Sequence, residues 1–185
     1  MKQPIIYFDN YMLRDVELKD AKDMFEYGKD LETVKFLSWG PYSDVTEAYG
    51  SIREFFLKRP ERGLPVGYAI VDLKNDKMIG TIDFHTMISE GVVEVGFCLN
   101  KAYWNKGIMS KSLQKILEVG FYYHGFNKII IGHANENLQS MRVIEKNNFI
   151  FEYEDHKKYY NRFTGLNEPS KWYYLTKETF KKWTI

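Results

Sequence analysis

The sequence has little cysteine, little net charge and no long apolar run. Cys98 is the single cysteine among 185 residues, so no internal disulfide bond can form. Lysine plus arginine number 26 and aspartate plus glutamate 25, and the net charge of +1 gives no broad field for binding nucleic acid or an anionic membrane. No apolar segment approaches the roughly 18 residues of a membrane-spanning helix, and the first ten residues lack the features of a signal peptide. These shortages favour a cytoplasmic protein with no direct nucleic-acid or membrane partner.

Internal repeats, low-complexity sequence and linker composition are also lacking. The five prolines are scattered along the chain rather than gathered in one stretch. A chain of 185 residues, 44% of them hydrophobic, can bury one sizeable core but is short for two. We therefore expect a single domain over residues 1–185, with its core at about 11–175. Aromatic residues, at 17%, are the one excess, and they suit core packing as readily as a ligand pocket.

Hydrophobic periodicity predicts an α/β fold. Asp20 and Asp44 are placed to cap two helices, and Glu47 completes a capping box with Asp44. A turn-rich segment separates two strands that should pair as a hairpin, and a second hairpin is expected near the C-terminus. The expected strands lie at 11–16, 66–72, 78–84, 91–99 and 128–132, and the expected helices at 20–28, 44–59, 111–121 and 138–146.

The segment 91–121 combines a strand, a short polar loop and an amphipathic helix. Leu113, Ile116 and Leu117 belong to one apolar stripe of that helix. The first amides of a helix have no internal partner and carry partial positive charge, so a pyrophosphate can bind there. Gly107 in the loop allows a close backbone approach, although a tight turn before the helix would need the same residue. The pattern alone leaves both interpretations open.

The same segment resembles the acetyl-CoA-binding motif of the GNAT N-acetyltransferases. That motif has Arg or Gln, two residues, Gly, any residue, and then Gly or Ala. Gly107 matches the central glycine, whereas Trp104 stands in place of the Arg or Gln and Met109 in place of the last small residue. The Tyr-Trp-x-Lys-Gly pattern at 103–107 is similar to the branch that acetylates the N-termini of ribosomal proteins.

A second segment, at 127–149, agrees with the family in order and spacing. Asn137 and Ser140 match the Asn-x-x-Ser with which the family begins a helix. Asn148 replaces a glycine just after that helix, and asparagine tolerates the same left-handed backbone. Asn137 can be a plain N-cap, and capping does not exclude a bond to pantetheine. The resemblance extends over about residues 11–175 and identifies a family rather than a substrate.

The resemblance implies the acyl-CoA N-acyltransferase fold of the GNAT family. In that fold a mixed, mostly antiparallel sheet, here expected to have six or seven strands, is flanked by helices. Two central strands splay apart to hold acetyl-CoA, whose pantetheine arm pairs with one strand while the loop amides hold the pyrophosphate. The cofactor-binding residues implied are Phe97, Cys98, Leu99, Trp104, Asn105, Lys106, Gly107, Ile108, Met109, Ser110, Asn137 and Ser140.

Glu94 is the candidate general base. Lysine and N-terminal amines have pKa values of about 10.4 and 7.7–8.0, so they must lose a proton before attacking a thioester. Glu94 shares a strand face with Gly96 and Cys98, and partial burial suits a carboxylate to proton transfer. A structural carboxylate within the sheet is the alternative. In the family a glutamate of this strand often acts as base, and a backbone N–H near Leu99 is implied as the oxyanion donor.

Ser140 is the candidate acid for the leaving thiolate. Many GNAT enzymes use a tyrosine in the helix after the second segment, but the aligned residue here is Ile144. Ser140 lies on an early turn of that helix and is the substitute that can hydrogen-bond or protonate the sulfur. The alternative is an ordinary polar residue of a helix start.

The resemblance implies direct transfer of an acetyl group from acetyl-CoA to a primary amine. The expected acceptor is the α-amine of a protein N-terminus, with a polyamine or aminoglycoside as the alternative, and Trp39 and His85 are candidates for lining its site. A catalytically silent acyl-CoA-binding module is a further alternative, against which the retained Glu94 argues. An RNA-binding, ribosome-associated protein ranks last because the charge balance suggests no basic face. No metal is expected, and a homodimer is left open.

Overall fold

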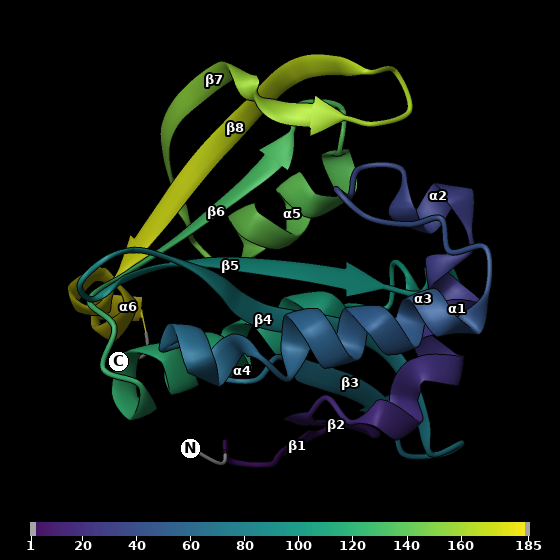
Figure 1. Ribbon diagram of the computed structural model, residues 1–185. Coiled ribbons are helices and arrows are strands. Elements are labelled where there is room, and N and C mark those ends of the chain that lie inside the picture. Colours follow the sequence, from purple (N-terminus) through teal and green to yellow (C-terminus); the bar gives the residue numbers. More distant parts are fainter. Residues whose placement is uncertain (1–2, 184–185) are drawn as a thin grey trace.

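The computed structural model describes residues 3–183, apart from the side chains of 157–159 and 181–183, and forms one mixed sheet with helices on both faces (Figure 1). Within these residues eight strands lie in the order β1-β2-β3-β4-β5-β6-β8-β7. All neighbouring strands are antiparallel except β5 and β6, which are parallel. The strands are β1 (Ile6–Phe8), β2 (Tyr11–Asp15), β3 (Tyr68–Asp72), β4 (Lys77–Ser89), β5 (Val92–Leu99), β6 (Lys128–Ala134), β7 (Ile150–Asn161) and β8 (Leu166–Thr176).

The helices include short 3-10 turns and two π-helical segments, each π segment continuing an α-helix. The α-helices are α1 (Ala21–Gly28), α2 (Leu31–Val34), α3 (Val45–Gly50), α4 (Ile108–Glu118), α5 (Leu138–Lys146) and α6 (Lys177–Trp183). The π segments are η2 (Ser51–Phe56) and η5 (Val119–Tyr123), and the 3-10 turns are η1 (Leu18–Asp20), η3 (Arg59–Arg62) and η4 (Lys101–Tyr103). In the described part of the chain, no helix is long and apolar enough to cross a membrane.

The predicted α/β fold class is confirmed, but the expected number of strands is too low. The sheet has one strand more than the upper figure of seven. The strand β1 accounts for the difference, because its three residues are too short to give a recognisable alternation. The predicted hairpin of β3 with β4 and the C-terminal hairpin of β7 with β8 are both present.

Helix α5 begins and ends where the sequence predicts. The side chain of Asn137 accepts a hydrogen bond from the Ser140 N–H at 3.1 Å, as an N-cap does. Asn148, just beyond the helix, has a φ of 60°, the left-handed conformation expected of it. The predicted boundaries hold because side chains at both ends specify them locally.

The two other predicted caps differ from the sequence interpretation in detail. Asp44 caps α3 by accepting from the Thr46 N–H at 2.6 Å, but Glu47 bonds Ser43 instead of completing a box with Asp44. Asp20 does not cap α1 with its side chain. Its carboxylate instead accepts from the buried Arg14 guanidinium at 2.6 and 2.8 Å, because that charge is the stronger partner.

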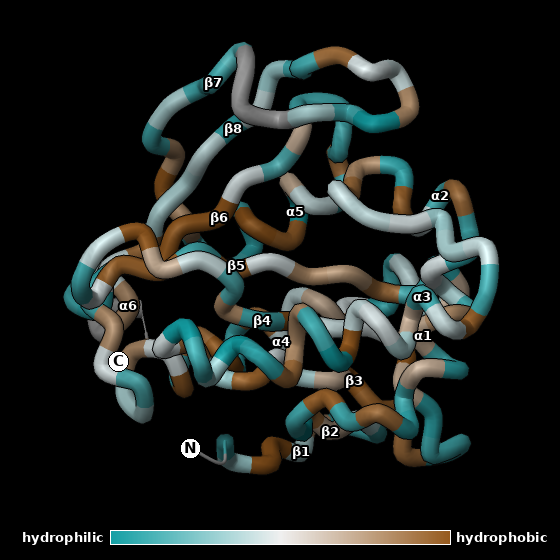
Figure 2. Tube along the Cα trace, in the orientation of Figure 1, coloured by the Kyte–Doolittle hydropathy of each residue, from teal (hydrophilic) through white to brown (hydrophobic). Residues whose placement is uncertain are grey.

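Two apolar layers lie on opposite faces of the sheet. One joins the strands to α4, α5 and α6, and the other joins them to α1, α3 and η2. In Figure 2 the hydrophobic stretches of the trace follow the inner strands, while many connecting loops are hydrophilic. The first layer includes Phe84, Val93, Val95, Leu113, Ile116, Ile129 and Ile144, and the second includes Met24, Tyr27, Ile52, Phe56, Val71 and Cys98.

The parallel strands β5 and β6 separate partway along their length. Their register pairs Val92 with Lys128 and ends with Glu94 opposite Ile130, although both strands continue to Leu99 and Ala134. Figure 1 shows the arrowheads of β5 and β6 well apart although the strands start together. The splayed strands implied by the family resemblance are therefore present.

A buried ion pair joins η3 to the middle of the sheet. Arg59 Nη1 lies 2.9 Å from Asp83 Oδ1, and the two side chains are only 1% and 9% exposed. The Arg59 guanidinium also lies over the rings of Phe55 and Phe56, 4.3 and 4.6 Å from their centres. The pair thus fixes the segment after α3 against β4.

Replacing Arg59 with Met should lower the free energy of unfolding by about 3–5 kcal/mol, because the Asp83 carboxylate would stay buried without its partner charge. The double variant Arg59→Met with Asp83→Asn should recover most of that loss. Denaturant unfolding of the wild type and the two variants measures both changes.

The exposed ion pair between Lys58 and Glu54 provides a matched control one residue away. Its side chains are 47% and 50% exposed and the pair is screened by water, so Lys58→Met should leave the free energy of unfolding close to that of the wild type. Equal losses in Lys58→Met and Arg59→Met would contradict the importance of the buried pair.

Candidate functional site

A cavity of about 680 Å³ lies between the end of β5, the start of α4 and the start of α5. It brings together eleven of the twelve residues that the sequence assigned to the cofactor. The cationic side chains of Lys35, Arg142 and Lys146 also line it, against the two carboxylates of Glu32 and Glu136, so the cavity wall has an excess of positive charge. The eleven are Phe97, Cys98, Leu99, Trp104, Asn105, Gly107, Ile108, Met109, Ser110, Asn137 and Ser140.

The start of α4 is open toward this cavity. Gly107 is the N-cap, has a φ of 74° and offers no capping side chain. A Cβ placed on Gly107 would meet nothing within 4 Å, so the space beside the first turn of α4 is empty. The first amides of a helix lack internal partners, and an anion can bind them with the favourable helix dipole. The residues present therefore fit the pyrophosphate of acetyl-CoA.

Two of the expected cofactor residues have other partners. Lys106 does not line the cavity, and its Nζ donates to the Ala102 carbonyl at 2.9 Å. The Trp104 amide donates to the Lys101 carbonyl at 3.1 Å, so it is already used within the turn, and the expectation that it binds phosphate does not fit. The Trp104 indole Nε1 donates to the Leu99 carbonyl at 2.7 Å. Trp104 thus joins the turn to the end of β5.

The edge of β5 presents hydrogen-bond donors to the gap. The Asn100 N–H donates to the Ile79 carbonyl at 2.8 Å and therefore faces β4. Because N–H directions alternate along a strand, the N–H groups of Leu99 and Phe97 point away from β4, toward the gap. A carbonyl-bearing chain such as pantetheine can pair with them as an added strand does.

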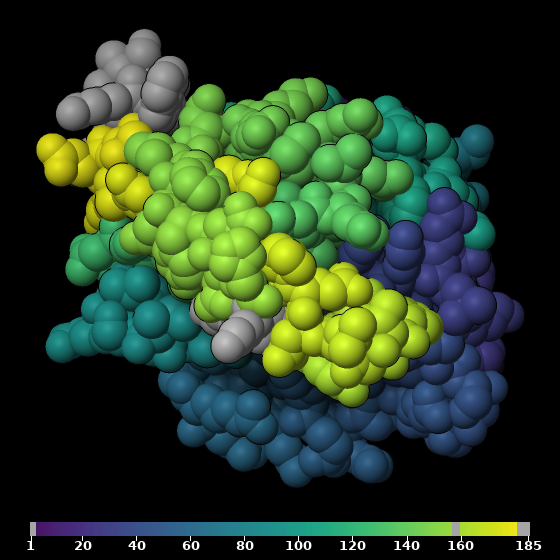
Figure 3. Space-filling model, turned by 90° about the horizontal axis from the view of Figure 1, so that it is seen from above, coloured from purple at the N-terminus to yellow at the C-terminus, as the bar shows by residue number. Residues whose placement is uncertain are grey.

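A second cavity, of about 380 Å³, adjoins the first on the face of the sheet that carries α1 and α3. Segment η2 and strand β8 contribute to its walls, and Figure 3 shows the β7–β8 hairpin beside the blue segment that contains α3 and η2. The predicted residues Glu94, Trp39 and His85 all line this cavity. Both cavities share Phe36, Leu37, Phe97, Cys98, Asn137 and Ser140, which therefore mark their junction.

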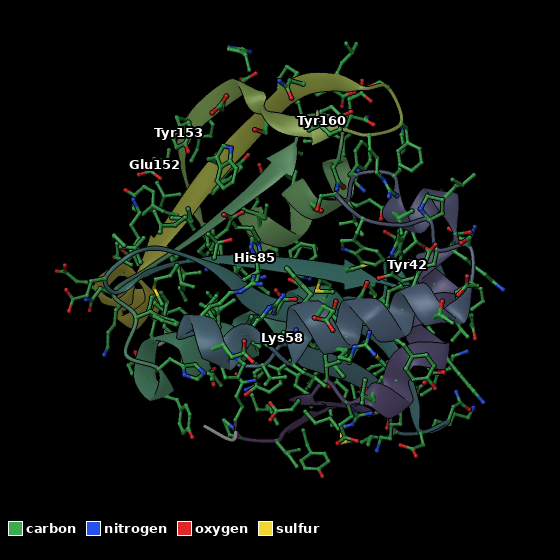
Figure 4. The ribbon with its side chains drawn as sticks, viewed as in Figure 1. Tyr42, Lys58, His85, Glu152, Tyr153 and Tyr160 are labelled. Carbon is green, nitrogen blue, oxygen red and sulfur yellow. The ribbon has the colours of Figure 1, made fainter. Side chains whose placement is uncertain are left out.

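Glu94 and His85 lie on neighbouring strands in the second cavity. His85 Nε2 is 3.6 Å from Glu94 Oε1, and the side chains are 26% and 17% exposed. His85 Nδ1 is 2.8 Å from the Thr86 hydroxyl oxygen, which orients the ring. Figure 4 labels His85 near the centre of the sheet, away from Tyr153 on the outer strand β7. Glu94 thus has the partial burial expected of a base and a titratable neighbour.

Cys98 lies at the junction of the cavities but is not suited to covalent catalysis. Burial raises the pKa of its thiol well above the usual range, so the nucleophilic thiolate is disfavoured. Burial also lowers the pKa of His133, another wall residue of the second cavity, and this keeps its ring neutral at pH 7. Among the described residues, no cluster of three His, Cys, Asp or Glu side chains could hold a metal ion.

Several wall residues of the second cavity escaped the sequence analysis. Trp172 and Ser170 belong to β8. They lie about 40 positions after their partners in β6, which include Gly132, so no local sequence motif connects the two strands. Asp83 was not among the predicted site residues, because its buried partner Arg59 lies far away in sequence. A glycine within a strand, as at 132, was the available signal, because it often marks a close approach.

Comparison with known proteins agrees with this geometry. Residues 10–150 match the family model described as an acetyltransferase (GNAT) domain. The uncharacterized N-acetyltransferase p20 of Bacillus licheniformis is 29% identical over 145 residues, which cover 78% of this chain and 81% of that protein.

Solved structures of acetyltransferases have the same fold. RimL, a ribosomal L7/L12 alpha-N-protein acetyltransferase in complex with coenzyme A, superimposes with a TM-score of 0.84 at 20% identity, covering 95% of this chain and 99% of RimL. The ribosomal-protein-S5-alanine acetyltransferase of Vibrio fischeri gives 0.81 at 20% identity, covering 96% and 99%. With the family match over most of its length and the open helix start beside splayed strands, this chain belongs to the GNAT family and is an acetyl-CoA-dependent N-acetyltransferase.

Proposed function

We propose that this enzyme acetylates the α-amine of a protein N-terminus, with Glu94 as the general base. The observation that carries the proposal is the meeting of the two cavities at the gap between β5 and β6, with Glu94 in the wall of the second. An amine in the second cavity would reach an acetyl thioester in the first through the residues they share. The transfer then needs no covalent enzyme intermediate.

Two considerations favour an α-amine over other amines. Its ordinary pKa of about 7.7–8.0 is well below the 10.4 of a lysine amine, so a carboxylate base removes its proton more readily. The names of RimL and the S5-alanine acetyltransferase also describe protein acceptors, and both proteins share the fold of this chain. A polyamine or aminoglycoside acceptor is the competing possibility.

Each step of the transfer has a candidate group. Acetyl-CoA supplies the activated acetyl thioester. Glu94 takes the proton from the attacking amine, directly or through a water molecule. The Leu99 N–H donates to the thioester oxygen as it gains negative charge, and the Ser140 hydroxyl hydrogen-bonds or protonates the departing sulfur. Asn137 caps α5 through its oxygen, which leaves its amide NH₂ to bind pantetheine.

Replacing Gly107 with Leu should raise the Kd for acetyl-CoA at least tenfold, because the side chain would fill the space beside the first amides of α4. Calorimetry with acetyl-CoA measures the change. Gly63→Leu is the matched control, since Gly63 also has a φ of 74° and nothing within 4 Å of an added Cβ. Both variants suffer similar backbone strain. Equal Kd values in the two variants would contradict the phosphate-binding role of this turn.

Replacing Glu94 with Gln should lower kcat by about 10²–10⁴-fold, the usual contribution of a general base, and should change the Kd for acetyl-CoA by less than about twofold. Release of free CoA thiol, measured with N-terminal peptides, polyamines and aminoglycosides, gives kcat and ranks the acceptors. Glu90→Gln in the exposed turn before β5 is the control and should keep full activity.

The same assay separates the competing functions. Faster turnover of a polyamine or aminoglycoside than of any peptide would exclude the N-terminal acceptor. Acetyl-CoA binding without turnover of any amine would indicate a silent acyl-CoA-binding module. An unchanged kcat in Glu94→Gln would exclude Glu94 as the general base. The ranking of the acceptors would still identify the preferred amine.

A further inference from the structure

Two rings in the second cavity lie against glycines on the strands that flank the gap. A Cβ added to Gly132 of β6 would be 2.8 Å from Cε2 and Cζ2 of Trp172. A Cβ added to Gly96 of β5 would be 2.9 Å from Cδ2 and Nε2 of His85. Both rings line the cavity. The two glycines thus give the rings room to lie close to the sheet, where side chains at 96 and 132 would hold them off.

Trp172 is held in this position from several sides. It is directly opposite Gly132 in the register of β6 with β8. Its indole Nε1 donates to the Ser170 hydroxyl oxygen at 3.0 Å, and the Tyr153 ring lies nearly parallel to it, at 10° and 6.2 Å between centres. Trp172 is 7% exposed, so little of the ring can move without disturbing these neighbours.

Trp172 and the candidate base share one face of the sheet. Glu94 is opposite Ile130 in the parallel register, so Glu94 and Gly132, two residues further along β6, point to the same side. Trp172 is opposite Gly132 and therefore points to that side as well. The indole face is an apolar surface that also attracts cations, whereas Glu94 provides a carboxylate in the same cavity. An ammonium group on an aliphatic carbon can contact the indole face and the carboxylate together.

We propose that Trp172, which packs on Gly132, determines acceptor specificity. Its ring limits the size of the side chain on the carbon atom that carries the reacting amine, which is the side chain of the acceptor's first residue. The inference rests on the proposed acetylation of N-terminal amines and names the residues that select among them. The indole forms the wall along which the amine-bearing carbon and its substituent lie. The lack of a side chain at Gly132 determines the position of the Trp172 ring in the cavity that Glu94 lines.

The geometry gives the direction of each change. Carbon atoms pack at about 3.5–4.0 Å, so a methyl group at 132 would push the indole roughly 1 Å away from β6. Because the ring lies over the face of the sheet that carries this cavity, Gly132→Ala moves it off the sheet and into the cavity that Glu94 also lines, which leaves less room there. Trp172→Phe removes one ring of the indole and its hydrogen bond to Ser170, and so widens that space.

The test compares peptides that differ only in their N-terminal residue, Gly or Phe, in the wild type, Gly132→Ala and Trp172→Phe. The ratio of kcat/KM for the Gly peptide to that for the Phe peptide should rise at least tenfold in Gly132→Ala and fall at least tenfold in Trp172→Phe. The Kd for acetyl-CoA should stay within twofold throughout. Gly50→Ala is the control, because nothing lies within 4 Å of its added Cβ, and its ratio should equal that of the wild type.

Binding of the same peptides to the CoA-loaded protein, measured by calorimetry, gives a second readout that does not need turnover. There the ratio of the Kd for the Phe peptide to the Kd for the Gly peptide should rise in Gly132→Ala and fall in Trp172→Phe. A wild type that turns over no amine but shows these shifts would contradict the proposed reaction while supporting the specificity role. Equal losses for both peptides in Gly132→Ala, an unchanged ratio in Trp172→Phe, or no peptide binding at all would overturn the inference. Melting temperatures confirm that each variant is folded.

Discussion

The hydrogen bonding between β5 and β6 stops after Glu94 and Ile130, and both cavities open where it stops. Buried N–H groups without partners are costly, so the free edge of β5 is stabilised by any ligand that offers carbonyl groups in an extended chain. The start of α4 has a similar need, because its first amides lack partners. Two sets of unused backbone donors therefore meet in one cavity, and they match the two polar parts of a single cofactor.

Strand β5 has three roles, because its side chains point to both faces of the sheet and its N–H groups point sideways. Val93 and Val95 point into the core on the side of α4, which holds the strand in place. Glu94 and Cys98 point to the opposite face, where the second cavity lies. The N–H groups of alternate residues point sideways into the gap. A shift of the register by one residue would exchange all of these roles, so the core packing of Val93 and Val95 also fixes the position of the candidate base.

The sequence predicted most of the fold and eleven of the 23 residues that line the first cavity, because the signals were local. Asn137 and Asn148 mark the ends of α5, and Gly107 and its neighbours lie in one continuous segment that resembles the family motif. The pattern of β5 predicted that Glu94 would face away from the core. The three-residue strand β1 was missed because it carries too few residues to show alternation.

The second cavity was only partly predicted, because its walls come from segments far apart in the chain. Gly132 and Trp172 meet only through the pairing of β6 with β8, and Asp83 meets Arg59 only in the folded core. The hydrogen-bonding partners of Trp104 and Lys106 also depend on the exact path of a short turn. Such contacts are decided by tertiary packing, which leaves little trace in local sequence.

The hydrogen bond from the Trp104 indole to the Leu99 carbonyl affects how accurately a ligand is positioned in the first cavity. It clamps the turn that leads into α4 onto the last residue of β5, so the two places where a long ligand would be held cannot drift independently. The distance between these two places is therefore fixed by the protein itself. A ligand bound by its phosphates at the start of α4 would therefore lie at a set position along β5.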